Sequence, residues 1–220
     1  MCWRPVRMDQ LVSFAGSPYP DPLAGRLEGD EPDGGDKILV QADRLAQAVR
    51  AARHGDEAGW DVLFERFHAD VHAYALARLG DWSGAEDVTQ ETFVAAVGSI
   101  RNLRDEREPA VQAWFLHICR HKTLDHIRRR SRQARTFRLD AALTADPAHL
   151  VETRLRADEL RAAMAELTED QRDILVRRFV LDQSLEAVAA GTRRSVGAVK
   201  SLQHRALAAL EKVLAARRAA

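Results

Sequence analysis

The chain has few of the residues that mark secreted or membrane proteins. Only two of its 220 residues are cysteines, Cys2 and Cys119, so a disulfide framework is excluded and a reducing compartment is expected. No apolar run approaches the roughly 20 residues of a membrane-spanning helix, which argues against membrane insertion. The N-terminal stretch contains two arginines followed by no sustained apolar core, which makes a poor signal peptide. We therefore expect a cytoplasmic protein.

The chain also lacks a net charge, because 33 Lys and Arg balance 33 Asp and Glu. Taken whole, this neutrality argues against a nucleic-acid partner, but the charge is segregated along the chain. Residues 41–100 carry 5 basic and 10 acidic side chains (net −5), whereas residues 101–140 carry 11 and 5 (net +6) and residues 171–220 carry 10 and 4 (net +6). Residues 1–40 and 141–170 are acidic, with net charges of −3 and −4. Screening confines a charge's field to about 10 Å, so each basic block can attract phosphate on its own.

Strand-like alternation is absent after Lys37, and helical periodicity takes its place. Five of the seven prolines and five of the twelve glycines lie in residues 1–36, which we predict to be a disordered N-terminal extension. The predicted fold class is all-α. Two helical domains, residues 37–131 and 147–216, are joined by a flexible linker at residues 132–146.

Capping and stop signals divide the first domain into helices near residues 41–53, 56–79 and 83–97, with a fourth from Pro109. Asp56 is the predicted N-cap of the second helix and Gly80 its end, while Ser83 is predicted to open the third. One face of the second helix is expected to be buried throughout. It comprises Trp60, Leu63, Phe64, Phe67, Val71, Tyr74 and Ala75.

The second domain has the helix caps and the turn residue expected of a helix-turn-helix. Thr168 and Gln171 fit a capping box, and Ser184 is the predicted cap of a short helix. Gly191 is predicted to form the tight turn, and Ser195 to cap a final helix reaching about residue 216. A short helix, a glycine turn and a longer basic helix are typical of this DNA-binding motif.

Two segments are candidate nucleic-acid surfaces. The final helix pairs an apolar back with a small and basic front, which suits a recognition helix as well as it suits a merely solvated face. The fourth helix carries seven cations within sixteen residues, more than are needed to complement a helix dipole. These cations are Arg120, Lys122, Arg128, Arg129, Arg130, Arg132 and Arg135.

A metal site at His117, Cys119 and His121 is not expected. At 100° per helical residue, Cys119 lies about 200° around the helix from His117, so the three side chains cannot converge. A core cysteine between two surface histidines is the favoured interpretation. We expect no cofactor, metal or catalytic residue.

Three ordered motifs resemble the extracytoplasmic-function (ECF) branch of the sigma-70 family. They are GAEDVTQETFVAA from residue 84, AWFLHICRHKTLDHIRRRSR from residue 113 and SLEAVAAGTRRSVGAVKSLQHRAL from residue 184. The resemblance covers residues 42 to about 213. It implies an alternative sigma factor that binds core RNA polymerase, through the clamp helices of its largest subunit, and promoter DNA. It also implies a separate anti-sigma factor as a regulator.

The resemblance also implies roles for individual residues. The polymerase-docking face would be Glu86, Asp87, Gln90 and Glu91. The minus-ten element would be bound by Arg101, Asn102, Arg120, His121, Lys122, Asp125, Arg128 and Arg129, with His121 standing where the family commonly has asparagine. The minus-thirty-five element would be read by Arg193, Arg194, Ser195, Lys200, Ser201, His204 and Arg205.

Two other classes of function remain as alternatives. A stand-alone helix-turn-helix regulator would bind promoters without polymerase, but a dimer would then be expected and no convincing dimerisation heptad is found. A metal-dependent nuclease could use the acidic cluster of Glu86, Asp87 and Glu91, yet nothing that binds phosphate adjoins it.

Overall fold

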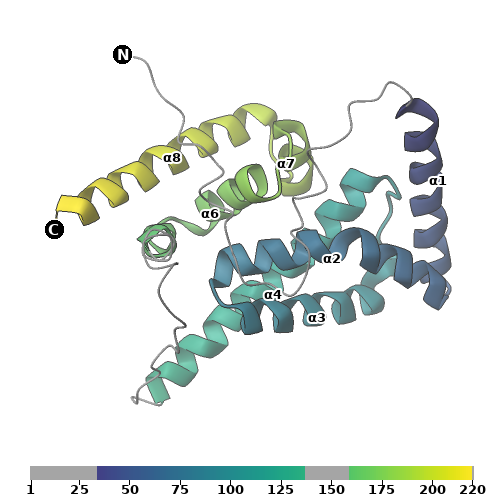
Figure 1. Cartoon of the computed structure of the whole chain (residues 1–220), viewed down its shortest axis with the longest axis horizontal. Helices are drawn as coiled ribbons and strands as arrows, with labels where there is room; N and C mark the ends of the chain where they lie inside the picture. Colours follow the sequence, from purple (N-terminus) through teal and green to yellow (C-terminus); the bar gives the residue numbers. More distant parts are fainter. Residues whose placement is uncertain (1–33, 137–158, 220) are drawn as a thin grey trace, which may run out of the picture.

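Every regular element that the computed structural model describes, within residues 34–136 and 159–219, is helical (Figure 1). The N-terminal unit contains α1 (Gly34–Arg53), α2 (Glu57–Leu79), α3 (Trp82–Ser99), the 3-10 helix η2 (Ile100–Asn102) and α4 (Glu108–Thr136). The C-terminal unit contains helical residues 159–165, α6 (Glu169–Leu175), the π-helical turn η3 (Val176–Val180), α7 (Leu185–Thr192) and α8 (Val196–Ala219). The predicted all-α class is confirmed.

The predicted helix ends are confirmed where a local capping interaction sets them. Asp56 accepts a hydrogen bond from the Ala58 amide at 3.0 Å, and Gly80 closes α2 in the left-handed conformation with φ +67°. Thr168 and Gln171 form the predicted capping box, in which each side chain bonds the other residue's amide. The prediction for Ser83 was wrong, because Asp81 caps α3 by accepting from the Gly84 amide.

Two predicted boundaries differ from those of the structure. Helix α1 begins at Gly34, so residues 34–36 are helical and do not belong to the expected disordered extension. Helix α4 runs through Thr136, so residues 132–136 continue the basic helix and do not begin the linker. The remainder of the predicted extension and linker, and the start of the second domain, lie outside the described residues.

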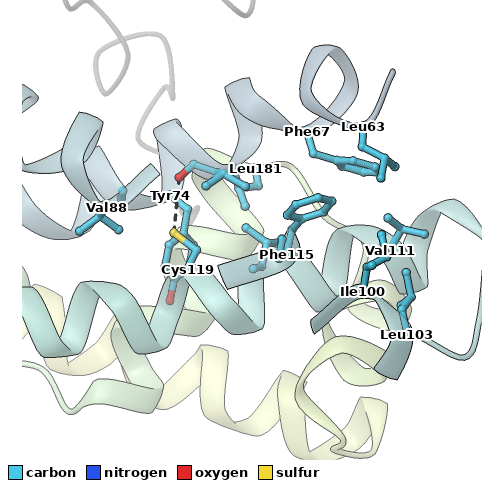
Figure 2. Close-up of a cluster of buried hydrophobic side chains, with 14 of the residues drawn as sticks. Leu63, Phe67, Tyr74, Val88, Ile100, Leu103, Val111, Phe115, Cys119 and Leu181 are labelled. Carbon is cyan, nitrogen blue, oxygen red and sulfur yellow. Dashed lines mark hydrogen bonds between the residues drawn. The ribbon is translucent and has the colours of Figure 1, made fainter. Parts of the chain in front are cut away.

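A single apolar cluster holds the N-terminal unit together. Helices α1 to α4 bury Leu63, Phe67, Val88 and Phe115 completely, and Figure 2 shows these side chains with Tyr74 and Cys119. Helix α2 lies very close to α1, because a Cβ at Gly59 would be 2.7 Å from the Ala48 carbonyl oxygen. The predicted stripe on α2 is buried except at its edge, where Phe64 is 49% exposed and Trp60 is half-buried.

The C-terminal unit buries two smaller clusters around α8. Val199 and Leu202 pack with Ile174, Val188 and Ala189, while Ala206 packs with Leu167 and Leu175. Through these contacts α8 is fixed against α6 and α7, and its opposite side is left to solvent.

The prediction that Gly191 forms the tight turn of the helix-turn-helix was wrong. Gly191 lies inside α7, and Arg193 adopts the left-handed conformation with φ +55° that ends the helix. Gly191 instead packs closely against α4, since a Cβ at this position would lie 3.1 Å from the Ala113 Cβ. The residue therefore allows α7 to approach α4 closely.

Candidate nucleic-acid interface

The acidic face of α3 presents three of its four predicted residues to solvent. Glu86, Asp87 and Gln90 are exposed, whereas Glu91 is half-buried. Glu91 accepts a hydrogen bond from Arg129 at 2.8 Å and forms an ion pair with Lys122 at 3.8 Å. The structure thus brings one residue of the predicted docking face into contact with two residues of the predicted minus-ten set.

The same face of α3 continues into exposed apolar residues that sequence reasoning missed. Val94 is 74% exposed and Val97 is 57% exposed, one and two turns beyond Gln90. Val94 and Val97 follow Gln90 by four and seven residues, which places them on its side of the helix. This spacing in the sequence could have identified them as part of the same exposed face. The α3 surface is therefore acidic at its N-terminal end and apolar at its C-terminal end.

Two partly buried histidines lie beside the acidic end of α3. The His68 and His72 rings stack at 6.1 Å, and His72 meets the Trp82 ring at 4.5 Å. Burial lowers the pKa of both histidines, and the negative charge of Glu86 opposes that shift. Both groups therefore favour the neutral imidazole near neutral pH.

The loop after η2 is held in place by arginines from α1. Glu106 accepts hydrogen bonds from Arg50 at 2.7 Å and from Arg53 at 2.6 Å, and Arg53 also donates to the Leu103 carbonyl. This arrangement exposes Arg101 and Asn102 at the molecular surface. A basic depression of about 580 Å³ adjoins them, lined by Arg53, His54, Arg101, Leu103 and Arg104.

The predicted minus-ten residues of α4 are surface residues, but their charges are partly compensated. His121, Asp125, Arg128 and Arg129 are exposed, while Arg120 and Lys122 are half-buried. Arg128 donates to Asp125 at 3.2 Å, as Arg129 does to Glu91. Exposed ion pairs of this kind contribute only about 0–1 kcal/mol, so phosphate can replace the carboxylates at small cost.

Cys119 is a core residue, as predicted. It is fully buried, and burial raises the pKa of its thiol to about 11. His117 and His121 are exposed on the opposite side of α4 with their rings 4.6 Å apart. Within residues 34–136 and 159–219, no group of three or more His, Cys, Asp or Glu side chains could hold a metal ion.

The front of the helix-turn-helix is open to solvent. Ser195 caps α8 by accepting from the Ala198 amide at 3.2 Å, and this fixes the start of the helix. The predicted residues of this surface are all exposed and lie on the turn and the first three turns of α8. They are Arg193, Arg194, Ser195, Lys200, Ser201, His204 and Arg205.

No helix in the described part of the chain is long and apolar enough to cross a membrane. The fold and its two basic surfaces define an all-helical protein with a four-helix unit followed by a helix-turn-helix unit. Two family models match these units in the same order. Sigma-70 region 2 matches residues 63–133, and Sigma-70, region 4 matches residues 163–212.

Curated relatives identify the family. The ECF RNA polymerase sigma factor SigC of Mycobacterium tuberculosis (strain CDC 1551 / Oshkosh) is 33% identical over 171 residues, covering 75% of this chain and 88% of its own length. SigD of the same strain is 32% identical over 191 residues, covering 81% and 88%. Among solved structures, CnrH in complex with the cytosolic domain of CnrY has 27% identity and a TM-score of 0.58, over 80% of this chain and 98% of that one. The chain therefore belongs to the ECF family of RNA polymerase sigma factors.

Proposed function

We propose that this chain acts in the cytoplasm as an alternative sigma factor that docks on core RNA polymerase and directs it to promoters with distinct minus-ten and minus-thirty-five elements. The main support for the proposal is that α4 and α8 each present a basic surface and that α3 presents an acidic one. The chain also belongs to the sigma factor family. Promoter opening needs no covalent chemistry. It needs phosphate neutralisation and capture of unstacked bases, which these side chains can provide.

Polymerase docking is assigned to α3. An exposed acidic surface is formed by Glu86, Asp87 and Gln90. Glu91 lies beside it and forms ion pairs with Lys122 and Arg129 of α4. A basic partner surface, such as the clamp helices of the largest polymerase subunit, would complement this charge. The exposed Val94 and Val97 would add apolar contact area at the other end of the same face.

The minus-ten element is assigned to the end of η2, to the loop of residues 103–107 that follows it and to α4. Arg101 and Asn102 project beside the basic depression, and the Glu106 contacts hold this loop against α1. The exposed stripe of His121, Asp125 and Arg128 would follow the backbone of a separated strand. The exposed Asp125, between His121 and Arg128, gives the stripe a hydrogen-bond acceptor for base amino groups.

The minus-thirty-five element is assigned to α8, whose N-terminal residues would enter a major groove. Arg193 and Arg194 precede the helix N-terminus, where phosphate is favoured, and Lys200 and Arg205 lie on its exposed front. A separate anti-sigma factor is the expected regulator. The likeness to CnrH, whose structure includes the cytosolic domain of CnrY, supports this expectation.

Run-off transcription with purified core polymerase tests the proposal. The chain should stimulate initiation at its own promoters, while mobility-shift assays with the chain alone should show only weak, salt-sensitive binding. Tight and specific binding by the free chain without stimulated transcription would instead support the stand-alone regulator.

Two variants test the separate surfaces. Arg205→Ala should weaken holoenzyme binding to the minus-thirty-five element by roughly 1–3 kcal/mol and leave core-polymerase affinity intact. Arg217→Ala, an exposed arginine of the same helix outside the proposed surface, is the matched control. Asp87→Arg should impair docking on polymerase, whereas the same charge change at the exposed Glu211 of α8 should not. Unchanged docking of Asp87→Arg would contradict the α3 assignment.

A further inference from the structure

Aromatic side chains form a continuous ring ladder along the seam between α2 and α3. On α2, the Phe64 and His68 rings lie 4.6 Å apart, and the His68 and His72 rings lie 6.1 Å apart and nearly parallel. From α3, Trp82 meets His72 edge-on at 4.5 Å, and Phe93 lies 4.9 Å from Phe64. Phe64 is 49% exposed and Trp82 is 40% exposed, so both ends of the ring ladder reach solvent.

The ring ladder adjoins the acidic face of α3. Glu86 follows Trp82 by four residues and precedes Phe93 by seven, which places its carboxylate on the same side of the helix. Glu86 is exposed, and within residues 34–136 and 159–219 no cation forms an ion pair with it. Its negative charge is therefore available both to the two histidines and to a docking partner.

The two histidines change charge just below neutral pH. Burial lowers the pKa of His68, and burial together with the charge of His68 lowers the pKa of His72. Glu86, the charged group of α3 that faces them, opposes both shifts. The His72 Nε2 atom is buried and has no hydrogen-bond partner in the part of the chain that the structure describes. Both rings are therefore neutral at pH 7.5, and each gains a positive charge beside the acidic face in acid.

Protonation reverses the electrostatic character of this surface. At neutral pH the ring ladder is apolar and is flanked by the exposed carboxylates of Glu86 and Asp87. In acid the two imidazolium charges balance these two carboxylates, and they also repel each other across the stacked rings. A basic partner that the neutral form attracts meets two added positive charges, which must lose their hydration when the surfaces close.

We propose that His68 and His72 make the polymerase-docking surface proton-sensitive, so that it holds the basic surface of polymerase while both rings are neutral and releases it in acid. The partner rests on the proposed function, whereas the coupling of the histidines to Trp82 and Glu86 does not. Polymerase is the occupant because the ring ladder is continuous with the acidic face already assigned to docking. The exposed Phe64 and Trp82 add apolar contact area beside the charges.

Trp82 reports the protonation of His72 without polymerase, because a protonated imidazole quenches an indole that it touches. Fluorescence of the wild type should fall between pH 8 and pH 5 with a midpoint below 6.5, and His72→Gln should lack this transition. Trp82→Phe should lack it too. His117→Gln is the matched control, since burial also lowers the pKa of His117 but its ring lies on α4. Circular dichroism at each pH checks that the helices persist. A transition that survives in His72→Gln would overturn the proposed contact.

The link to the acidic face is tested by removing one carboxylate at a time. Glu86→Gln should move the fluorescence midpoint to lower pH, because the charge of Glu86 favours the imidazolium forms. Asp87→Asn removes the same charge one residue further along α3, on a different side of the helix, and should move the midpoint less. An equal shift in the two variants would show that only net charge matters and would refute the pairing with Glu86.

Equilibrium binding to immobilised core polymerase tests the docking itself, at constant ionic strength. From pH 7.5 to pH 5.5 the wild type should lose about tenfold in affinity, because two protons must leave the rings before the surfaces close. His68→Gln with His72→Gln keeps polar side chains that do not titrate, so its affinity should change by less than about twofold. Each single variant should show an intermediate loss, and His117→Gln should lose as much as the wild type.

The outcomes separate the proton switch from the proposed function. An equal loss of affinity in the wild type and the double histidine variant would overturn the switch, as would a wild-type affinity that does not change with pH. If the wild type does not bind core polymerase at pH 7.5, the proposed function is wrong. In that case the Trp82 titration still decides whether His72 changes charge beside Glu86.

Discussion

The hydrogen bond between Tyr74 and Asp173 offers the sharpest quantitative test of the packing between the two units. Tyr74→Phe removes only the hydroxyl that donates to Asp173 at 2.6 Å and leaves the ring in the apolar cluster. A hydrogen bond to an ionised group contributes about 1.5–3 kcal/mol, so we expect a loss of about 2 kcal/mol in the free energy of unfolding. Asp173→Asn should cost more, about 3–5 kcal/mol, because it leaves Arg177 buried without its ionised partner.

A double-mutant cycle followed by urea unfolding isolates the contact. The two single variants, the double variant and the wild type are compared by circular dichroism, with Ser201→Ala as an exposed hydroxyl deletion that should change stability by less than about 0.5 kcal/mol. We expect a coupling energy of about 1.5 kcal/mol between Tyr74 and Asp173. A coupling below about 0.5 kcal/mol would mean that the two units do not share this contact in solution.

Four further outcomes follow from particular contacts. The Cys119 thiol, with its pKa raised to about 11 by burial, should not react with a thiol reagent at pH 8 unless the protein is unfolded; rapid native labelling would contradict the core packing. Burial and the charge of Asp173 raise the pKa of Tyr74 well above 10.0, so the protonated phenol stabilises the fold below pH 10 and this contribution is lost as the pH rises further. Absorbance at 295 nm should therefore show a late tyrosine titration that disappears in Tyr74→Phe. Gly59→Ala should destabilise the protein by about 1–3 kcal/mol in thermal unfolding, because its Cβ would meet the backbone of α1; a gain in stability would refute that close approach. Glu106→Gln should weaken the hold of Arg50 and Arg53 on the loop of residues 103–107, and it should reduce promoter melting, measured by permanganate footprinting, more than promoter binding. Glu106→Asp, which keeps the carboxylate, should retain part of the melting activity.

Local signals predicted most of the helical framework. Asp56, Gly80 and the Thr168 capping box act on atoms within four residues of themselves, so the printed sequence contains everything that sets these helix ends. Periodicity identified the buried faces because residues three or four positions apart share one side of a helix. It failed at Phe64, because the width of a buried face depends on what the neighbouring helices cover.

The error at Gly191 shows where local reasoning stops. A glycine before two arginines resembles a turn residue, yet the left-handed conformation is adopted by Arg193. Gly191 lies close to Ala113 of α4, which is distant in sequence and adjacent in space. Nothing within α7 reveals that contact.

The candidate surfaces likewise depend partly on the local sequence and partly on tertiary packing. The sequence by itself determined which residues are basic, acidic or apolar, their helical phase and the family to which the motifs point. Only the tertiary structure decided that Glu91 pairs with Arg129, that Glu106 anchors a loop to α1 and that Asp170 bridges Arg120 and Arg194. Those contacts join positions 24 to 56 residues apart, and Tyr74 meets Asp173 across 99 residues. Such pairings depend on how whole helices pack, because packing fixes distances that helical periodicity leaves open.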